Sequence, residues 1–126
     1  MYNPQHELLA YLKSKGIVPQ AYSPLGSSNA PLLTDNNVVQ IAKKHSLQSS
    51  DVLLGYLCMI FFVVTYDDIT LTGYLLVAKG IVILPKSVTP ARIRSNFTGA
   101  ITAANKLDSA DLQTLDGLAA NGKQKR

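Results

Sequence analysis

The segment Ile83-Leu84-Pro85-Lys86-Ser87-Val88-Thr89-Pro90-Ala91-Arg92-Ile93-Arg94-Ser95-Asn96-Phe97 decides how this 126-residue sequence is interpreted. Residues Ile81 to Leu84 form a β-rich run, and Thr89-Pro90 is typical of the cap and first position of a helix. The free N–H groups and positive dipole end of such a helix attract anions. Lys86 adds a point charge, and Arg92 on the first turn adds a planar fork suited to a phosphate monoester. The segment therefore predicts a phosphate pocket, with solvated surface charges beside an ordinary helix as the alternative.

The same segment closely resembles the Ile-Pro-Lys-Ser motif of the aldo-keto reductases, in which a Lys, a Ser and an Arg hold the 2′-phosphate of NADP. One position departs from the family pattern. Ser95 stands where most members carry an acidic residue whose carboxylate lies on the adenine side of the cofactor. The resemblance therefore implies NADP(H) as cofactor and contacts to its phosphate, but not contacts to adenine. The matching positions are Lys86, Ser87, Val88, Thr89, Arg92 and Asn96.

A second block, Gly16 to Ser27, reads Gly-Ile-Val-Pro-Gln-Ala-Tyr-Ser-Pro-Leu-Gly-Ser and resembles the seventh strand and following loop of the same family. The resemblance implies that Tyr22 stacks on the nicotinamide ring. It also implies that Ser23, Leu25 and Ser27 line a loop over the pyrophosphate. Without the resemblance, Tyr22 would be interpreted as a core aromatic residue and the loop as a simple turn.

The predicted fold class is α/β, as the C-terminal portion of a (β/α)8 TIM barrel that is incomplete. A closed barrel of this kind takes about 250 residues, and this sequence forms a single partial domain over residues 1–126. Two strands are expected, Ile17 to Tyr22 and Ile81 to Leu84, with flanking helices. Pro19 lacks an N–H group for the ladder, which predicts a bulge in the first strand.

The family catalyses hydride transfer with an Asp, a Tyr, a Lys and a His in the first half of its barrel, and none of these has a counterpart here. The resemblance thus implies part of an NADPH-dependent reductase of aldehydes and ketones, with small carbonyl compounds as substrates of the full-length parent. The chain as written is expected to be inactive. The alternative is a non-enzymatic remnant that binds a nucleotide weakly.

Residues Cys58 to Leu76 interrupt the family pattern, and their removal would join Leu57 directly to Val77. Our hypothesis is that this insertion is translated from an unspliced intron, with an extended helix or a hairpin as alternatives. A membrane anchor fits poorly, because the apolar run Val52 to Tyr66 is shorter than the roughly 20 residues that span a bilayer, and two aspartates follow it. We therefore expect a cytoplasmic protein with no membrane partner.

The remaining helices are predicted from caps and apolar periodicity. A first helix would use Asn3 as cap and Gly16 as stop, and a third would be capped near Ser50. The second, Asp35 to His45, would bury Val38, Val39, Ile41 and Ala42. The last, Ser109 to Ala120 with Gly122 after it, would begin with a capping box at Asp108 to Asp111 and turn Leu112, Leu115 and Leu118 inward.

Composition excludes several other classes of function. The net charge of +4 comes from scattered basic residues, so we expect no nucleic-acid partner. Cys58 is the single cysteine, which rules out an intrachain disulfide or a cysteine zinc site. His6 and His45 are interpreted as solvated helix positions. No metal is therefore expected.

Overall fold

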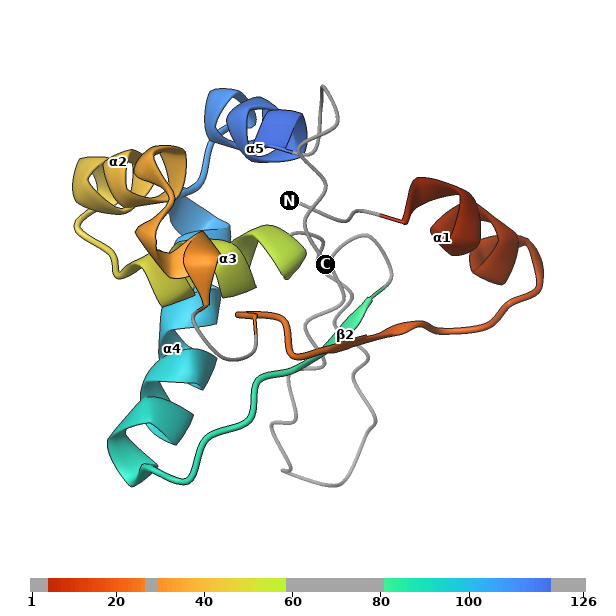
Figure 1. The fold of residues 1–126 in the computed structure, drawn as a ribbon, viewed down its shortest axis with the longest axis horizontal. Coiled ribbons are helices and arrows are strands. Elements are labelled where there is room, and N and C mark those ends of the chain that lie inside the picture. The colour runs from red at the N-terminus through yellow and green to blue at the C-terminus, as the bar shows by residue number, and fades with distance from the viewer. Residues whose placement is uncertain (1–4, 27–29, 59–80, 119–126) are drawn as a thin grey trace, which may run out of the picture.

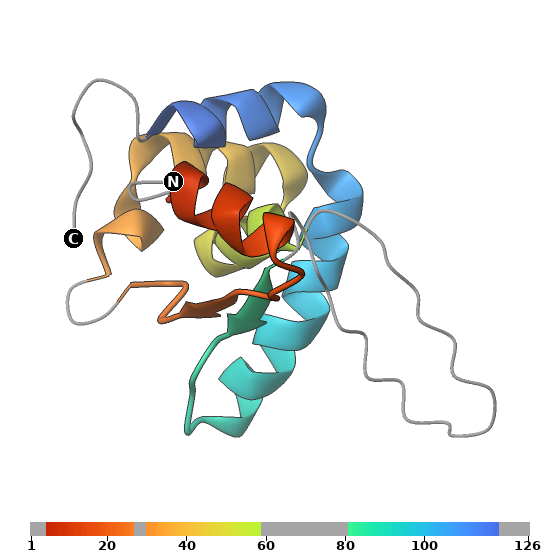
Figure 2. The ribbon, with the colours of Figure 1, turned by 90° about the vertical axis from the view of Figure 1, so that its right-hand side faces the viewer.

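The computed structural model describes residues 5–26, 30–58 and 81–118. In these parts of the chain a group of helices lies on one side of a short sheet, and one further helix lies apart beyond it (Figures 1 and 2). In chain order the elements are α1 (His6–Ser14), β1 (Gln20–Tyr22), the 3-10 helix η1 (Pro31–Thr34), α2 (Asn36–His45), α3 (Ser49–Leu57), β2 (Val82–Leu84), α4 (Pro90–Lys106) and α5 (Ser109–Asp116).

Strands β1 and β2 form a two-stranded parallel sheet in which Gln20 pairs with Val82 and Tyr22 with Leu84. Parallel neighbours need a long connection, and here it contains η1, α2 and α3. Side chains alternate between the two faces of a strand. Ile83 accordingly packs against the helices, in a cluster with Leu54 and Ala100, whereas Tyr22 and Leu84 are exposed.

Both strands were predicted, but each is shorter than expected. The first begins at Gln20 instead of Ile17, and the second at Val82 instead of Ile81. The bulge predicted at Pro19 is wrong, because this residue precedes the strand and needs no donor there. Its carbonyl oxygen instead accepts the N–H of Val82 at 2.9 Å, which extends the pairing by one bond.

The hydrophobic core lies between α2, α3 and α5. Residues 51–56 of α3 are all buried, and Leu53 is completely enclosed together with Val38 of α2 and Leu115 of α5. Helix α3 also crosses α4 very closely at Gly55, where a Cβ atom would lie 3.0 Å from the backbone nitrogen of Ala104. The absence of a side chain at this glycine permits the crossing, which holds the C-terminal half of α4 against α3.

The helix starts follow the predicted chemistry with small shifts. The Asp35 side chain caps α2 by accepting the N–H of Asn37 at 2.9 Å. Helix α3 was expected to be capped near Ser50, but its cap is Gln48, and the Asp51 carboxylate accepts the Gln48 N–H at 3.0 Å. Helix α1 begins at His6, while its predicted cap, Asn3, lies outside the described residues.

The helix ends agree less well with the sequence. Gly16 has φ +66°, a left-handed conformation that ends the first helix as predicted. Helix α5 has the expected capping box, but it ends at Asp116 instead of Ala120. Its leucine stripe faces the core as predicted, with Leu115 and Leu118 buried and Leu112 half-buried.

Helix α3 ends at Leu57, the last residue before the predicted insertion, and Cys58, the first residue of the insertion, is its buried C-cap. Residues 59–76 of the insertion lie outside the described residues, so its origin as an intron stays a prediction. Among the helices that the structure describes, none is both long enough and apolar enough to span a lipid bilayer.

Candidate functional site

The predicted phosphate segment connects the end of β2 to the start of α4. Ser87 is half-buried, and its Oγ accepts the backbone N–H of Thr89 at 3.1 Å, which fixes the turn before the helix. Thr89 is the N-cap and Pro90 the first helical residue, as predicted. The expected capping by the Thr89 side chain is wrong, because no side-chain bond caps this helix. The first-turn N–H groups of a 17-residue helix are therefore open toward an anion.

Two cations lie next to this helix start without acidic partners. Lys86 and Arg92 are exposed, and none of the ion pairs between described residues involves either of them. Ser95, which replaces the family's acidic residue, donates its hydroxyl to the carbonyl oxygen of Arg92 at 3.2 Å. Its side chain is thus directed back onto its own helix. Val88 is 80% exposed and Asn96 is half-buried, so both lie at the surface of the same segment.

The loop after β1 contains the second group of predicted residues. Tyr22 is 87% exposed, so the alternative of a core aromatic residue is wrong. Ser23 and Gly26 both have positive φ, and the Gly26 N–H donates to the Ser23 carbonyl at 2.9 Å, closing a tight turn. Leu25 anchors this turn by packing against the core clusters. Ser27 lies outside the described residues.

The sheet brings the two loops to one edge. Because β1 and β2 are parallel and Tyr22 pairs with Leu84, the residues after both strands leave from the same, carboxyl end of the sheet. That end of a parallel barrel is where its functional loops lie. The exposed ring of Tyr22 ends β1, and Lys86 and Arg92, which form no ion pair among the described residues, follow β2. Together with the N–H groups at the start of α4, these side chains could hold a ligand that has a phosphate group and a ring.

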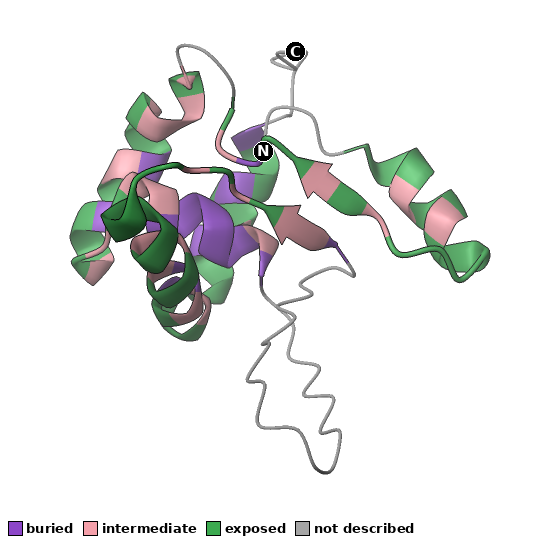
Figure 3. Cartoon of the chain, turned by 90° about the horizontal axis from the view of Figure 1, so that it is seen from below, coloured by how far each residue is buried: buried purple, intermediate pink, exposed green. Residues whose placement is uncertain are grey.

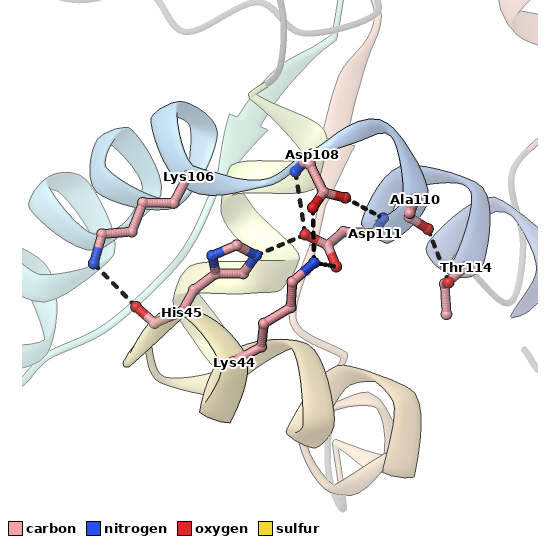
Figure 4. A network of polar contacts seen from close by, with 7 residues as sticks. All are labelled: Lys44, His45, Lys106, Asp108, Ala110, Asp111 and Thr114. Atoms are coloured by element: carbon pink, nitrogen blue, oxygen red, sulfur yellow. Dashed lines mark hydrogen bonds and ion pairs between the residues drawn. The ribbon is translucent and has the colours of Figure 1, made fainter.

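The structure also contains a polar network that sequence reasoning missed (Figure 4). Lys44 Nζ at the end of α2 donates to Asp108 Oδ2 at 2.7 Å and to Asp111 Oδ1 at 2.9 Å. His45 Nε2 lies 2.7 Å from Asp111 Oδ2, and Lys106 Nζ donates to the His45 carbonyl at 3.0 Å. These contacts tie the end of α2 to the junction of α4 and α5.

Charge pairing changes the acidity of this network. The hydrogen bond from Lys44 lowers the pKa of Asp108 to about 2. Burial acts to raise the pKa of Asp111, but hydrogen bonds from Lys44 and His45 outweigh it and lower the pKa. The two carboxylates in turn raise the pKa of Lys44.

The prediction that His45 is a solvated helix position is wrong, because its side chain is only 15% exposed and contacts a buried carboxylate. No sequence signal could have shown this, since its partner is 66 residues away. His45, Asp108 and Asp111 each offer a ligand atom within 4.8 Å of the others, in the manner of a metal site. However, Lys44 Nζ contacts both carboxylates and supplies the positive charge that a metal ion would bring. This cluster therefore connects the end of α2 to the junction of α4 and α5.

The parallel strands and the helices that cover them define an incomplete α/β barrel. The chain superposes on an aldo/keto reductase from Brucella melitensis with a TM-score of 0.65 and 27% identity, covering 90% of this chain and 34% of that one.

Two curated relatives match nearly the whole chain. The sequence is 36% identical over 126 residues to a glycerol 2-dehydrogenase (NADP(+)) of Saccharomyces cerevisiae, covering 98% of this chain and 32% of the relative. It is also 36% identical over 127 residues to a D-galacturonate reductase of Hypocrea jecorina, covering 98% of this chain and 33% of that protein. These relatives and the solved structure show that the chain belongs to the aldo-keto reductase family. It spans about a third of the length of these relatives. No family model matches the sequence.

Proposed function

We propose that this chain carries the part of an NADP(H)-dependent aldo-keto reductase that binds the 2′-phosphate of the cofactor. The observation that supports the proposal is the position of two cations, Lys86 and Arg92, beside the start of α4, where neither forms an ion pair with any residue that the structure describes. A phosphate monoester carries up to two negative charges, and these two side chains supply a matching positive charge together with the helix dipole.

Each residue has a proposed role in this site. Lys86 binds a phosphate oxygen as a point charge, Arg92 binds two oxygens with its planar guanidinium, and the Ser87 and Thr89 hydroxyls complete the donor set. Asn96 and Val88 border the pocket. On the neighbouring loop Tyr22 stacks on the nicotinamide ring, and Ser23, Leu25 and Ser27 lie along the pyrophosphate.

The bound cofactor would supply the hydride for carbonyl reduction, and this chain would contribute binding and orientation of that cofactor. No residue of the sequence corresponds to the catalytic Asp, Tyr, Lys and His of the family, so we propose that the 126-residue chain alone does not transfer hydride. For a whole protein that contains this segment, the proposed substrates are small aldehydes and ketones. The proposal is in line with relatives named as an aldehyde reductase and a glycerol 2-dehydrogenase.

The proposal is tested by calorimetric titration of the chain with 2′-AMP and 5′-AMP, two ligands that differ only in where the phosphate lies. We expect tighter binding of 2′-AMP and a loss of about tenfold in Lys86→Met and in Arg92→Met, equivalent to about 1.4 kcal/mol. Arg94→Met is the matched control, because Arg94 is exposed on the same helix but two positions away, on its other side. Equal binding of the two nucleotides, or equal effects of the Arg92 and Arg94 variants, would refute the proposed site.

The absence of catalysis is tested separately with NADPH and glyceraldehyde. We expect no oxidation of NADPH above the rate without protein. Sustained turnover that is lost in Lys86→Met would show that the chain contains its own reaction centre.

A further inference from the structure

Helix α4 begins differently from α2 and α5. The Asp35 carboxylate caps α2 by accepting the N–H of Asn37 at 2.9 Å. The Asp108 carboxylate caps α5 by accepting the N–H of Asp111 at 2.9 Å. The cap of α4 is the neutral Thr89, whose side chain makes no capping bond, and no acidic residue lies in the first turn. This helix therefore lacks the negative charge that the helix dipole favours at its start.

The third helical position adds to this difference. In α5 this position is Asp111, whose carboxylate accepts the N–H of the cap residue Asp108 in return, at 3.1 Å. In α4 it is Arg92, a cation that forms no ion pair with any described residue. A cap residue and the residue three positions later are neighbours in space. An anion on the Thr89 side chain would therefore lie beside both the N–H and the guanidinium group of Arg92.

Thr89 has the chemistry by which such an anion can be added. A phosphate on its hydroxyl would bring up to about two negative charges and three acceptor oxygens. Residues 88–94 are all exposed, and Thr89 has an extended backbone with φ −94° and ψ 116°. Figure 3 shows the start of α4 as an exposed region in green, while the buried residues gather among the helices behind it. The hydroxyl is thus accessible to a modifying enzyme.

The sequence contains two hydroxyl residues that are followed by proline, in the pairs Thr89-Pro90 and Ser23-Pro24. Pro90 is exposed, whereas Pro24 is buried. Ser23 also has a positive φ of 50° and accepts the N–H of Gly26 in a tight turn. An enzyme that recognises the proline after its target can therefore reach Thr89, but it can reach Ser23 only if this turn opens.

We infer that Thr89 is a phosphorylation site, and that its phosphate binds Arg92, Lys86 and the first-turn N–H groups of α4 in place of a phosphate-bearing ligand. A proline-directed protein kinase would transfer the γ-phosphoryl group of ATP. The bond between Thr89 Oγ1 and phosphorus forms, the bond from phosphorus to the β–γ bridging oxygen breaks, the hydroxyl proton is released and ADP leaves. The competition with a nucleotide rests on the proposed function, whereas binding of the phosphate to its own helix does not.

The acceptor residue is tested by incubating the full chain with ATP and a protein kinase that modifies Thr-Pro and Ser-Pro sequences. We expect mass spectrometry to find phosphate on Thr89 and none on the Thr89→Val variant. Absence of phosphate from the chain, or phosphate on Ser23 and not on Thr89, would overturn the assignment of the acceptor.

The contacts of the phosphate are tested by phosphorus NMR on the full chain prepared with phosphothreonine at position 89. The matched control has phosphothreonine at position 114 instead, because Thr114 is exposed on α5 and has no basic residue three or four positions away. Cations favour the doubly charged phosphate, so we expect its second pKa to lie below the ordinary value of about 6 at position 89 and to stay there at position 114. Arg92→Met should raise the pKa at position 89. Equal pKa values at the two positions, or no effect of Arg92→Met, would overturn the proposed contacts.

The competition is tested by calorimetric titration of the same proteins with 2′-AMP. We expect phosphothreonine at position 89 to weaken binding by about tenfold or more, and phosphothreonine at position 114 to leave it unchanged. Circular dichroism should show the same helix content in all forms. Lack of 2′-AMP binding by the unmodified chain would refute the proposed function but not the contacts of the phosphate, which the phosphorus NMR decides. Equal binding by the unmodified chain and the chain modified at Thr89 would overturn the competition.

Discussion

Replacing Gly55 by alanine tests the close crossing of α3 and α4. The added Cβ atom would lie 3.0 Å from the backbone nitrogen of Ala104 and 3.1 Å from the carbonyl carbon of Ala103, and it would overlap the Ala103 methyl group. Backbone atoms cannot rotate away, so α3 and α4 must separate. The separation would loosen the packing of α3 against the C-terminal half of α4.

The expected loss of stability follows from two opposing terms. Inserting a methyl group into a closely packed crossing costs about 1–3 kcal/mol, and the backbone contacts here favour the upper value. Alanine in place of glycine inside a helix recovers about 1 kcal/mol. The net change is therefore about 2 kcal/mol of unfolding free energy, or roughly 8 °C in the midpoint of thermal unfolding for a domain of this size.

Gly117→Ala is the matched control for this substitution. Gly117 has φ −67°, and nothing lies within 4 Å of the position of its Cβ atom. Alanine should therefore raise the free energy of unfolding by about 0.4–1 kcal/mol, because it lowers the conformational entropy of the unfolded chain. Both variants are followed by far-ultraviolet circular dichroism during heating and urea titration. A Gly55→Ala variant as stable as Gly117→Ala would show that α3 and α4 do not approach each other this closely.

Two further predictions concern titratable groups. The folded pKa of Asp108 is about 2, below its ordinary value of 3.8, and the pKa of Asp111 is also lowered. The ionised forms of both carboxylates therefore stabilise the folded chain above pH 3.8, and this stabilisation is lost as the pH falls toward 2. The urea concentration at which half of the protein is unfolded should fall more steeply with decreasing pH for the wild type than for Asp108→Asn, and equal slopes would contradict the pairing with Lys44. Burial raises the pKa of the Cys58 thiol to about 11. A thiol reagent should therefore modify the folded protein slowly near neutral pH and the urea-unfolded protein rapidly. Rapid labelling of the folded chain would show that Cys58 is accessible.

Local sequence signals predicted the helix starts better than the strand starts. The capping residues Asp35 and Asp108 act within three residues of their partners, so their effect can be read from the sequence. Strand limits depend on where the partner strand offers hydrogen bonds. The sheet begins at Gln20 and not at Ile17 for this reason, and Pro19 joins it only through its carbonyl group.

The candidate site was predictable because most of it is contiguous. The turn between β2 and α4 contains Ser87 and Thr89, and the first turn of α4 contains Arg92. Their arrangement therefore follows from chain geometry once a strand and a helix flank them. The ligand comes from the resemblance to the aldo-keto reductases, and its binding to this chain stays a proposal. The resemblance did not show that the Thr89 side chain leaves the start of α4 uncapped, because a hydroxyl at that position can cap the helix or point away.

By itself the sequence determined the short-range features of this protein: the helices, the capping residues, the turn at Gly16 and the order of residues in the phosphate segment. Only the tertiary structure decided how distant segments meet, such as His45 with Asp111, Gly55 against α4, and Tyr22 at the same sheet edge as the end of β2. The physical reason is range. Capping and apolar periodicity act over a few residues, whereas packing and buried charge pairs depend on groups that only the folded chain brings together.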